Sequence, residues 1–319
     1  MPTRRHSSSS SSSSSSSQAA HARAAGPTHA TARLRATQIG ALAILLWAML
    51  ALLSTQARRL PPFELLALTF GVASLLGIFR IVQSGRSVLS ALRQPVAAWA
   101  VGVGGLFGYH ALYFFALAKA PAVHVSLIAY LWPLLLVLMS GGSPRGRRRF
   151  SSLAGAALGM GGVVLLVGSG QGGGMMRFDR AYVAGYAAAL ACAFTWSGYS
   201  LLNRRLDKVP VDFVAGACLV TAVLGGIVHG AIETTVVPTG REAMAVLALG
   251  AGPVGAAFLL WDHGTKQGDL PLLGVLSYAT PLLSTFVLVA FGAASLSWSL
   301  GAACVLITGG AWIAARGAA

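Results

Sequence analysis

The side chains best suited to binding a solute lie in two long apolar stretches between Gly104 and Met139. His110 and Tyr113 are three residues apart in the first stretch, a spacing that places them on one face of a helix. An imidazole and a phenol can both exchange hydrogen bonds with a polar solute. Because an ionisable group is costly inside a membrane, His110 is either a site residue or a buried histidine bonded to a neighbouring helix.

The second stretch carries Tyr130, Trp132 and Pro133. Proline has no N–H and its ring clashes with the carbonyl four residues earlier, so we expect Pro133 to kink the helix and free that carbonyl. The same Tyr-x-x-Pro spacing recurs in Tyr278 and Pro281. Prolines are common in membrane helices generally, but matching broken helices in two halves of a chain indicate a transport site.

Two further pairs share helix faces. Trp196 and Tyr199 are suited to stacking on a flat or apolar solute, or to donating hydrogen bonds to it. An interfacial aromatic belt is the alternative, and the central position of Trp196 in its apolar segment disfavours it. Asp262 and Lys266 are four residues apart and can form an ion pair. Near a helix end, this pair is a structural contact or a gate latch rather than a catalytic dyad.

The composition is that of a membrane protein. The 319 residues are 55% hydrophobic and 10% charged, with a mean hydropathy of +0.72, whereas soluble domains are about 25% charged. The net charge of +15 comes from the N-terminal tail and short loops, which excludes a nucleic-acid-binding face. Cys192, Cys218 and Cys304 lie in apolar runs, so they predict neither a disulfide nor a metal site.

Ten apolar segments follow a Ser-rich tail, residues 1–36, which is predicted to be disordered. Each segment is close to the length of about 20 residues that crosses a bilayer, and unpaired backbone groups are not tolerated in lipid, so all ten are predicted to be helices. The predicted spans are 38–56, 63–83, 96–118, 121–141, 150–170, 181–203, 212–232, 242–264, 270–291 and 295–315.

The basic residues predict the orientation. If the N-terminus is cytoplasmic, 17 Lys and Arg residues lie on the cytoplasmic side and 6 lie outside. This distribution follows the positive-inside rule. We therefore expect both termini to be cytoplasmic.

The chain also repeats itself. An offset of 148 superposes the two Tyr-x-x-Pro motifs, and an offset of 149 superposes Trp47 on Trp196. The chain then divides into halves of five spans each, 38–170 and 181–316. Because five is odd, the second half enters the membrane from the opposite side, an arrangement typical of secondary transporters. The predicted fold is an all-α integral membrane protein, with ten transmembrane helices as two inverted five-helix repeats around a central cavity.

The pattern resembles the drug/metabolite transporter superfamily with paired EamA-type domains, over about residues 38–316. The stretch SLIAYLWPL at 126–134, after GYHALYFFAL at 108–117, is similar to the aromatic amino acid exporter branch. This resemblance implies amino acid export across a bacterial inner membrane, with His110, Tyr113 and residues 130, 132 and 133 in the cavity. Small multidrug exporters of the superfamily use a glutamate in the first helix, and the first span here has no acid.

The sequence thus predicts an inner-membrane exporter of neutral, mainly aromatic amino acids that works by alternating access, as a monomer in the lipid bilayer. No motif for ATP hydrolysis, enzymatic catalysis or a cofactor is found. Two alternatives stay open: export of another small metabolite or lipophilic drug, and a membrane-embedded enzyme or scaffold without transport. The predicted substrate-binding residues are His110, Tyr113, Tyr130, Trp132, Pro133, Trp196, Tyr199, Tyr278 and Pro281, and the possible gate is Asp262 with Lys266.

Overall fold

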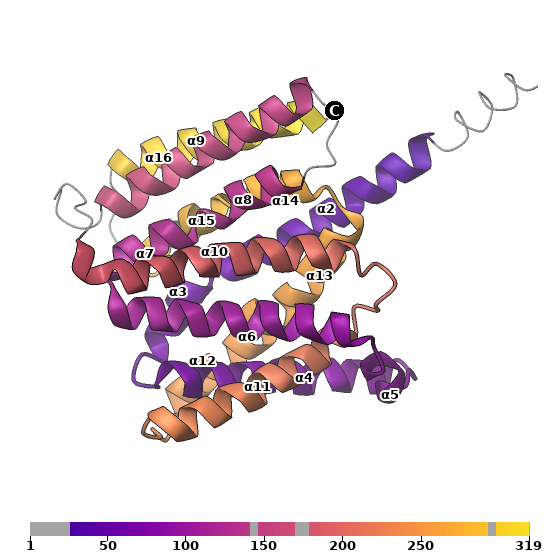
Figure 1. The fold of residues 1–319 in the computed structure, drawn as a ribbon, viewed down its shortest axis with the longest axis vertical. Coiled ribbons are helices and arrows are strands. Elements are labelled where there is room, and N and C mark those ends of the chain that lie inside the picture. The colour runs from indigo at the N-terminus through magenta and orange to yellow at the C-terminus, as the bar shows by residue number, and fades with distance from the viewer. Residues whose placement is uncertain (1–25, 141–145, 170–178, 293–297, 319) are drawn as a thin grey trace, which may run out of the picture.

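Helices make up the regular structure of the computed structural model, which describes residues 26–140, 146–169, 179–292 and 298–318. No strand occurs in these ranges. Figure 1 shows the helices stacked across the molecule with their long axes roughly side by side. In chain order they are α2 (Gly26–Ala48), α3 (Leu50–Gln56), α4 (Pro62–Gln83), α5 (Val88–Leu92), α6 (Val96–Lys119), α7 (Ala122–Ala129), α8 (Trp132–Met139), α9 (Arg147–Ser169), η1 (Arg180–Tyr182), α10 (Val183–Arg204), α11 (Phe213–Ile232), α12 (Gly240–Leu249), η2 (Gly250–Ala256), α13 (Ala257–Gln267), α14 (Leu270–Leu276), α15 (Ala279–Ala290) and α16 (Trp298–Ala318).

The first helix begins earlier than the sequence predicts. Helix α2 starts at Gly26, so residues 26–36 are helical rather than part of a disordered tail, and residues 1–25 lie outside the described residues. Arg33 pairs with Asp269 at 2.8 Å, and the Thr37 hydroxyl accepts the backbone N–H of Asp269 at 2.8 Å. These contacts hold the first turns of α2 against the second half of the chain.

Six helical segments are long and apolar enough to cross a membrane. They are Ala30–Gln56, Pro62–Gln83, Val96–Lys119, Phe213–Ile232, Gly240–Gln267 and Leu270–Ala290. Three shorter apolar segments, together with α10, fall where the other four spans are predicted: His124–Met139, Arg149–Leu165 and Trp298–Ala314. The chain is therefore a multi-pass membrane protein.

Prolines place the breaks between helices. Helix α7 ends at Ala129, and Pro133 lies in the first turn of α8, so the predicted break in this span is present. Helix α14 ends at Leu276 and α15 begins at Ala279, two residues before Pro281. In both spans, proline cannot donate the backbone hydrogen bond that would continue the preceding helix.

The two halves of the chain interlock and run in opposite directions. Helix α2 packs on α13, α6 on α10, α4 on α11, α8 on α14 and α9 on α16. Exchanging the halves turns the first of these pairs into the second and maps the α4–α11 and α9–α16 pairs onto themselves. Helices α8 and α14 belong to the fourth and ninth spans, which are equivalent in the repeat. In Figure 1, α2 runs from right to left whereas its counterpart α10 runs from left to right, and α4 and α11 are opposed in the same way. The observed fold is thus a helical repeat with inverted direction.

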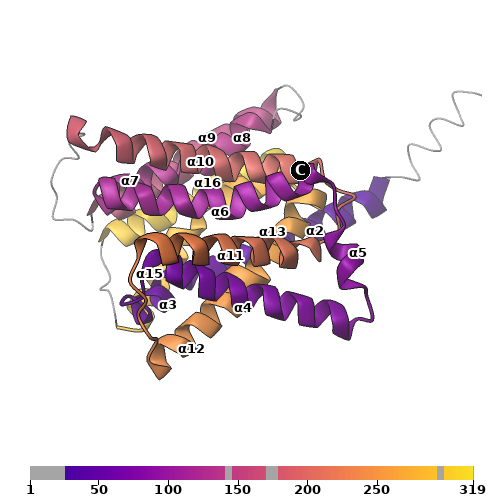
Figure 2. The same ribbon diagram turned by 60° about the horizontal axis from the view of Figure 1, so that its bottom comes forward.

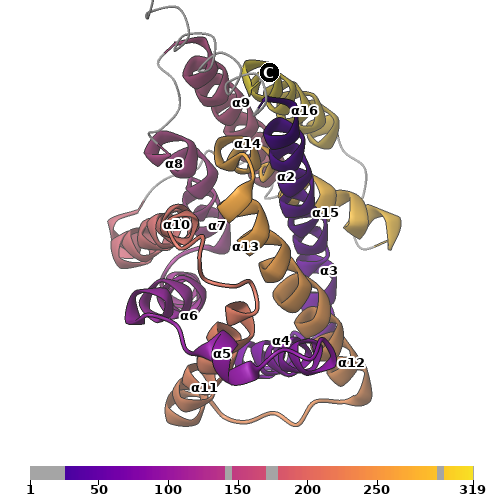
Figure 3. The same cartoon turned by 90° about the vertical axis from the view of Figure 1, so that its right-hand side faces the viewer.

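The beginning of α2 and the end of α16 lie at the same end of the molecule, on the right in Figure 1. Figure 3 looks along the helices from this end, which we call the terminus end. The opposite end, where α4 begins and α6 stops, is called the far end. Figure 2 shows α4 and α11 side by side along their length, between the two ends.

Candidate functional site

A cavity of about 410 Å³ lies between the two halves. Its walls come from the α2–α3 junction, the first turns of α4, the second half of α6, α7 and the segment around η2. These segments lie toward the far end, so the cavity is displaced toward that end. The lining residues are Trp47, Leu50, Ala51, Ser54, Leu65, Leu66, Thr69, Phe70, Tyr109, His110, Tyr113, Phe114, Ser126, Ala129, Tyr130, Trp132, Trp196, Leu249, Pro253, Val254, Phe258 and Thr280.

Four tryptophans from four helices form a compact cluster beside the cavity. Trp47 and Trp196, the pair related by the internal repeat, have ring centroids 5.7 Å apart. Trp261 is fully buried and lies 5.1 Å from Trp47 and 5.8 Å from Trp132. Edge-on and tilted contacts of this kind are favourable aromatic geometries. Trp47, Trp132 and Trp196 face the cavity, while Trp261 continues the cluster toward the terminus end.

The α6 face of the cavity carries the polar aromatic groups. The Nδ1–H of His110 donates to the Leu106 carbonyl at 2.7 Å, because a carbonyl can only accept. The proton thus sits on Nδ1, and Nε2 remains as the second ring nitrogen of a cavity-lining histidine. Tyr113 lies 3.5 Å from the Ser126 hydroxyl, and its ring is stacked 6.0 Å from Tyr109. The hydrogen bond between His110 and Leu106 lies within α6 and does not connect His110 to a neighbouring helix.

A segment of π-helix supplies another part of the wall. Residues 250–256 form η2, and Pro253 lies inside it. Trp47 donates its indole N–H to the Pro253 carbonyl at 3.0 Å, which ties the first span to the eighth. A π-turn inside a longer helix is frequent at functional sites because it redirects side chains and backbone carbonyls. The sequence analysis did not single out this feature.

Five of the nine predicted substrate-binding residues line the cavity and four do not. His110, Tyr113, Tyr130, Trp132 and Trp196 lie together in its wall. The other four, Pro133, Tyr199, Tyr278 and Pro281, are buried outside this lining.

Close packing explains where the two remaining tyrosines lie. Tyr199 packs against Gly105, where an added Cβ would be 2.4 Å from the ring, and Tyr278 packs in the same way against Gly159 at 2.5 Å. Such distances are possible only because each partner is glycine. Tyr199 lies behind Trp196, with ring centroids 5.2 Å apart. The two tyrosines therefore fill helix interfaces instead of facing a solute.

Several lining residues were not predicted. Tyr109 and Phe114 belong to the same stretch as His110, and Trp47 was visible as the repeat partner of Trp196. The internal repeat pointed to Tyr278 and Pro281, which lie in the correct turn. The residue of that turn that lines the cavity is Thr280. Phe70 and Phe258 carry no sequence signal, because only long-range packing brings their rings to 5.6 Å from one another.

Asp262 and Lys266 form an ion pair outside the cavity. The Lys266 ammonium lies 2.9 Å from the Asp262 carboxylate and 2.9 Å from the Val209 carbonyl. Asn203 donates to Asp262 at 3.0 Å and to Thr265 at 3.0 Å. Both charged side chains are almost completely buried. This network joins α13 to α10 on the terminus side of the tryptophan cluster.

The described architecture matches a known family over most of the chain. The model of the EamA-like transporter family matches residues 35–168 and again residues 183–316. The chain belongs to the EamA-like transporter family. Each half carries one EamA copy, which accounts for the repeat seen in both the sequence and the structure.

Similar proteins include two curated transporters and one solved structure. A protein from Ancylobacter novellus named aromatic amino acid exporter YddG is 51% identical over 282 residues, covering 88% of this chain and 97% of the relative. The protein of the same name from Escherichia coli (strain K12) is 24% identical over 299 residues, covering 89% of this chain and 99% of the relative. A solved structure titled "Crystal structure of protein" matches with a TM-score of 0.85 and 50% identity, over 89% of this chain and 97% of that one.

Proposed function

We propose that this EamA-family transporter exports neutral, mainly aromatic amino acids across a bacterial inner membrane. The observation that carries the proposal is the cavity between the repeats, whose wall holds three tryptophans, three tyrosines and His110. Its volume of about 410 Å³ is within the range of sites for small ligands, about 300–1,000 Å³. The name of the relative with 51% identity, aromatic amino acid exporter, points to the same substrate class.

The two kinds of lining group suit the two parts of an amino acid. The indoles and phenyl rings offer stacking and edge-on contacts to an apolar or aromatic side chain. The hydroxyls of Thr69, Ser126 and Thr280 and the ring of His110 offer hydrogen bonds to the ammonium and carboxylate. Broken helices, which free backbone carbonyls, provide further acceptors for the ammonium, as in other carriers with inverted repeats. None of the lining residues that the structure describes carries a carboxylate, which suits a zwitterion better than a cation.

In this proposal all ten segments cross the membrane and both termini are cytoplasmic. The cavity then faces the outside, and the tryptophan cluster with the Asp262–Lys266 network separates it from the cytoplasm. Rocking of one repeat against the other about the breaks near Pro133 and Pro281 would close the far end and open the terminus end. One chain contains the whole cavity, so a monomer is the proposed functional unit.

The proposal is tested by flux in proteoliposomes. Labelled phenylalanine should cross faster than in protein-free liposomes, and unlabelled aromatic amino acids should compete better than basic or acidic ones. Competition by lipophilic drugs or unrelated metabolites, with none by amino acids, would favour the alternative substrate classes. Flux equal to that of empty liposomes, from protein that is folded by circular dichroism, would contradict transport and favour an enzyme or scaffold.

A further inference from the structure

Two of the four tryptophans in the cluster beside the cavity have an indole N–H without a hydrogen-bond partner. In the other two, the N–H is paired within the protein: Trp47 donates to a backbone carbonyl at 3.0 Å, and Trp261 donates to a serine hydroxyl at 3.1 Å. The N–H groups of Trp132 and Trp196 have no acceptor among the residues that the structure describes. The cluster therefore contains two paired donors and two unpaired ones.

Both unpaired donors belong to buried residues of the cavity wall. Trp132 and Trp196 are 7% and 5% exposed, and both line the cavity. Each of their indole nitrogens keeps some accessible surface, because neither is among the completely covered polar atoms without a partner. A buried donor normally has an acceptor in the protein, in an ordered water or in a ligand. These two N–H groups are thus available to a molecule that occupies the cavity.

The internal repeat shows why the Trp196 donor is unpaired. Its counterpart Trp47 meets the carbonyl of Pro253, which lies in the π-helix η2. The position equivalent to Pro253, at the offset of 148, is Gly105, which lies inside the continuous helix α6. A carbonyl inside an α-helix already accepts from the N–H four residues later. The repeat therefore supplies an acceptor to one indole and none to its equivalent.

Neighbouring groups hold the two rings in place. Ser197 directly follows Trp196, and its hydroxyl donates to the Trp132 carbonyl at 2.8 Å, which ties α10 to α8. The ring centroids of Trp132 and Trp196 are 6.3 Å apart, with an angle of 79° between the ring planes. Trp261 contacts both rings, at 5.8 Å and 6.4 Å. The two donors therefore come from adjacent rings whose positions are set by packing.

An indole N–H differs from the other polar side chains of the cavity because it donates and cannot accept. The hydroxyls of serine, threonine and tyrosine can serve a carboxylate or an ammonium equally. The imidazole of His110 has its proton on Nδ1, so Nε2 of this tautomer is an acceptor. None of the lining residues that the structure describes is lysine or arginine. The groups that suit a carboxylate and exclude an ammonium are therefore the indoles.

We propose that the indole N–H groups of Trp132 and Trp196 bind the carboxylate of the transported amino acid. This inference rests on the proposed function. It gives two neutral donors the role that arginine often has in carboxylate recognition. Two hydrogen bonds from fixed rings orient the substrate, with its ammonium away from groups that cannot accept from it. An amine of the same size leaves both donors unpaired and binds more weakly, so the pair selects amino acids over amines.

Three ligands with the same ring and chain length separate the contributions of the two charged groups. Phenylalanine carries both groups, phenylpropionate carries only the carboxylate, and phenethylamine carries only the ammonium. Their dissociation constants are measured by isothermal titration calorimetry on the purified full-length chain in detergent. The variants are Trp132→Phe and Trp196→Phe, which remove the N–H and keep an aromatic ring. Trp47→Phe is the matched control, because the N–H of this cavity-lining indole is bonded to the protein.

We expect the unsubstituted protein to bind phenylalanine and phenylpropionate more tightly than phenethylamine. Trp132→Phe and Trp196→Phe should each weaken binding of the two carboxylates about five- to tenfold, as for the loss of one hydrogen bond, and that of phenethylamine less than about twofold. Trp47→Phe should change all three constants by the same factor. Comparison between ligands isolates the N–H, because the smaller ring alters packing for all three.

An unchanged ratio of phenylalanine to phenethylamine affinity in both Trp132→Phe and Trp196→Phe would overturn the proposal. An equal change of this ratio in Trp47→Phe would also overturn it. Failure of the proposed substrates gives a different result: phenylpropionate then binds through the two indoles, whereas phenylalanine does not bind. If neither carboxylate ligand binds, the carboxylate site and the proposed substrates are both wrong.

A second measurement needs no variant to fold. In protein with isotopically labelled indole nitrogens, a hydrogen bond to a carboxylate moves the N–H proton signal downfield. Phenylalanine and phenylpropionate should move two of the seven indole signals in this way, and phenethylamine should move neither. Equal shifts with all three ligands, or no downfield shift with either carboxylate, would contradict the assignment.

Discussion

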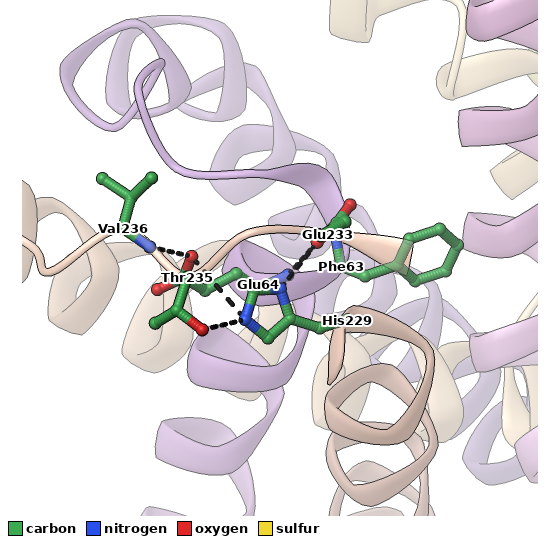
Figure 4. Close-up of polar contacts among 6 residues, drawn as sticks. All are labelled: Phe63, Glu64, His229, Glu233, Thr235 and Val236. Carbon is green, nitrogen blue, oxygen red and sulfur yellow. Dashed lines mark hydrogen bonds and ion pairs between the residues drawn. The ribbon is translucent and has the colours of Figure 1, made fainter. Parts of the chain in front are cut away.

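The two ends of the bundle are built from the same repeat, yet they differ in how they are closed. At the terminus end, partly buried ion pairs cross between elements: Arg33 with Asp269, and Arg80 and Arg86 with Asp212. The buried pair of Lys266 and Asp262 lies within α13, and Asn203 joins it to α10. At the far end, an aromatic cavity of about 410 Å³ reaches between the halves. Glu64, the acid there that corresponds to Asp212, contacts His229 and the backbone N–H of Val236 instead of arginine (Figure 4).

This difference shows how an inverted repeat can favour one conformation. If the two halves were identical, the states with the cavity at either end would have equal free energy. Substitutions at equivalent positions remove this equality, as with Asp212 between two arginines and Glu64 beside His229. Arginine ion pairs and the buried Asp262–Lys266 network connect helices at the terminus end, whereas Glu64 at the far end contacts a histidine and a backbone N–H.

The largest effect is expected from breaking the buried network at the terminus end. Lys266→Ala leaves the Asp262 carboxylate buried without its cation, and loss of one partner of such a pair costs about 3–5 kcal/mol of unfolding free energy. Chemical or thermal unfolding of purified protein in detergent measures it. Lys208→Ala, which removes an exposed lysine from the same end, is the control and should change stability little. Equal stability of the two variants would show that the network does not hold this end.

A smaller loss is expected where the helices approach most closely. Gly105→Ala would place a methyl group 2.4 Å from the Tyr199 ring, and overpacking of this kind costs about 1–3 kcal/mol. Gly104→Ala is a matched control one residue away, because in the part of the chain that the structure describes nothing beyond the local backbone of α6 lies within 4 Å of the added carbon. Unfolding of the two variants under the same conditions separates packing from helix propensity. A destabilised Gly104→Ala with an unaffected Gly105→Ala would contradict the described α6–α10 interface.

Removing one aromatic wall of the cavity should weaken the binding of phenylalanine. Trp196→Ala deletes a ring that lines the cavity, and aromatic contacts are worth about 0.5–1.5 kcal/mol each beyond their buried area. We therefore expect roughly a two- to tenfold weaker apparent affinity for phenylalanine, measured by competition in flux or by thermal stabilisation. Trp298→Ala, at a residue that is 89% exposed, should leave the affinity unchanged. The reverse order of effects would locate the binding site elsewhere.

The smallest effect is expected from the partly exposed ion pair between Arg80 and Asp212. The Arg80 side chain is 47% exposed, so Arg80→Gln should cost only about 0–1 kcal/mol of unfolding free energy. Because arginine does not titrate near neutrality, this loss should be the same at pH 6 and pH 8. A loss well above 1 kcal/mol, or one that differs between pH 6 and pH 8, would contradict this expectation.

Much of the fold could be predicted because local chemistry determines it. Apolar length predicted the helical segments, Pro133 and Pro281 predicted breaks within two of them, and the near-148 offset predicted the two halves. The start of α2 was misplaced because its helical turns outside the apolar run depend on distant contacts with Asp269. The π-helix around Pro253 was also missed, since a proline among glycines does not specify that geometry.

The candidate site was only partly predictable for a related reason. The spacing of His110 and Tyr113 identifies a shared helix face, and that face does line the cavity. Symmetry alone identified Tyr278, but its side chain packs on Gly159 while the neighbouring Thr280 faces the cavity. Which side chain of a turn faces a cavity is decided by the partner helices, and a single sequence does not reveal those partners.

The most direct test of the account asks whether the cavity is the path of the amino acid. Phenylalanine counterflow is measured in proteoliposomes containing the Ser54→Cys variant before and after complete modification by a bulky maleimide. Because Ser54 lies in the cavity wall, we expect modification to abolish counterflow and phenylalanine to slow the modification. Undiminished counterflow in fully modified protein would contradict it.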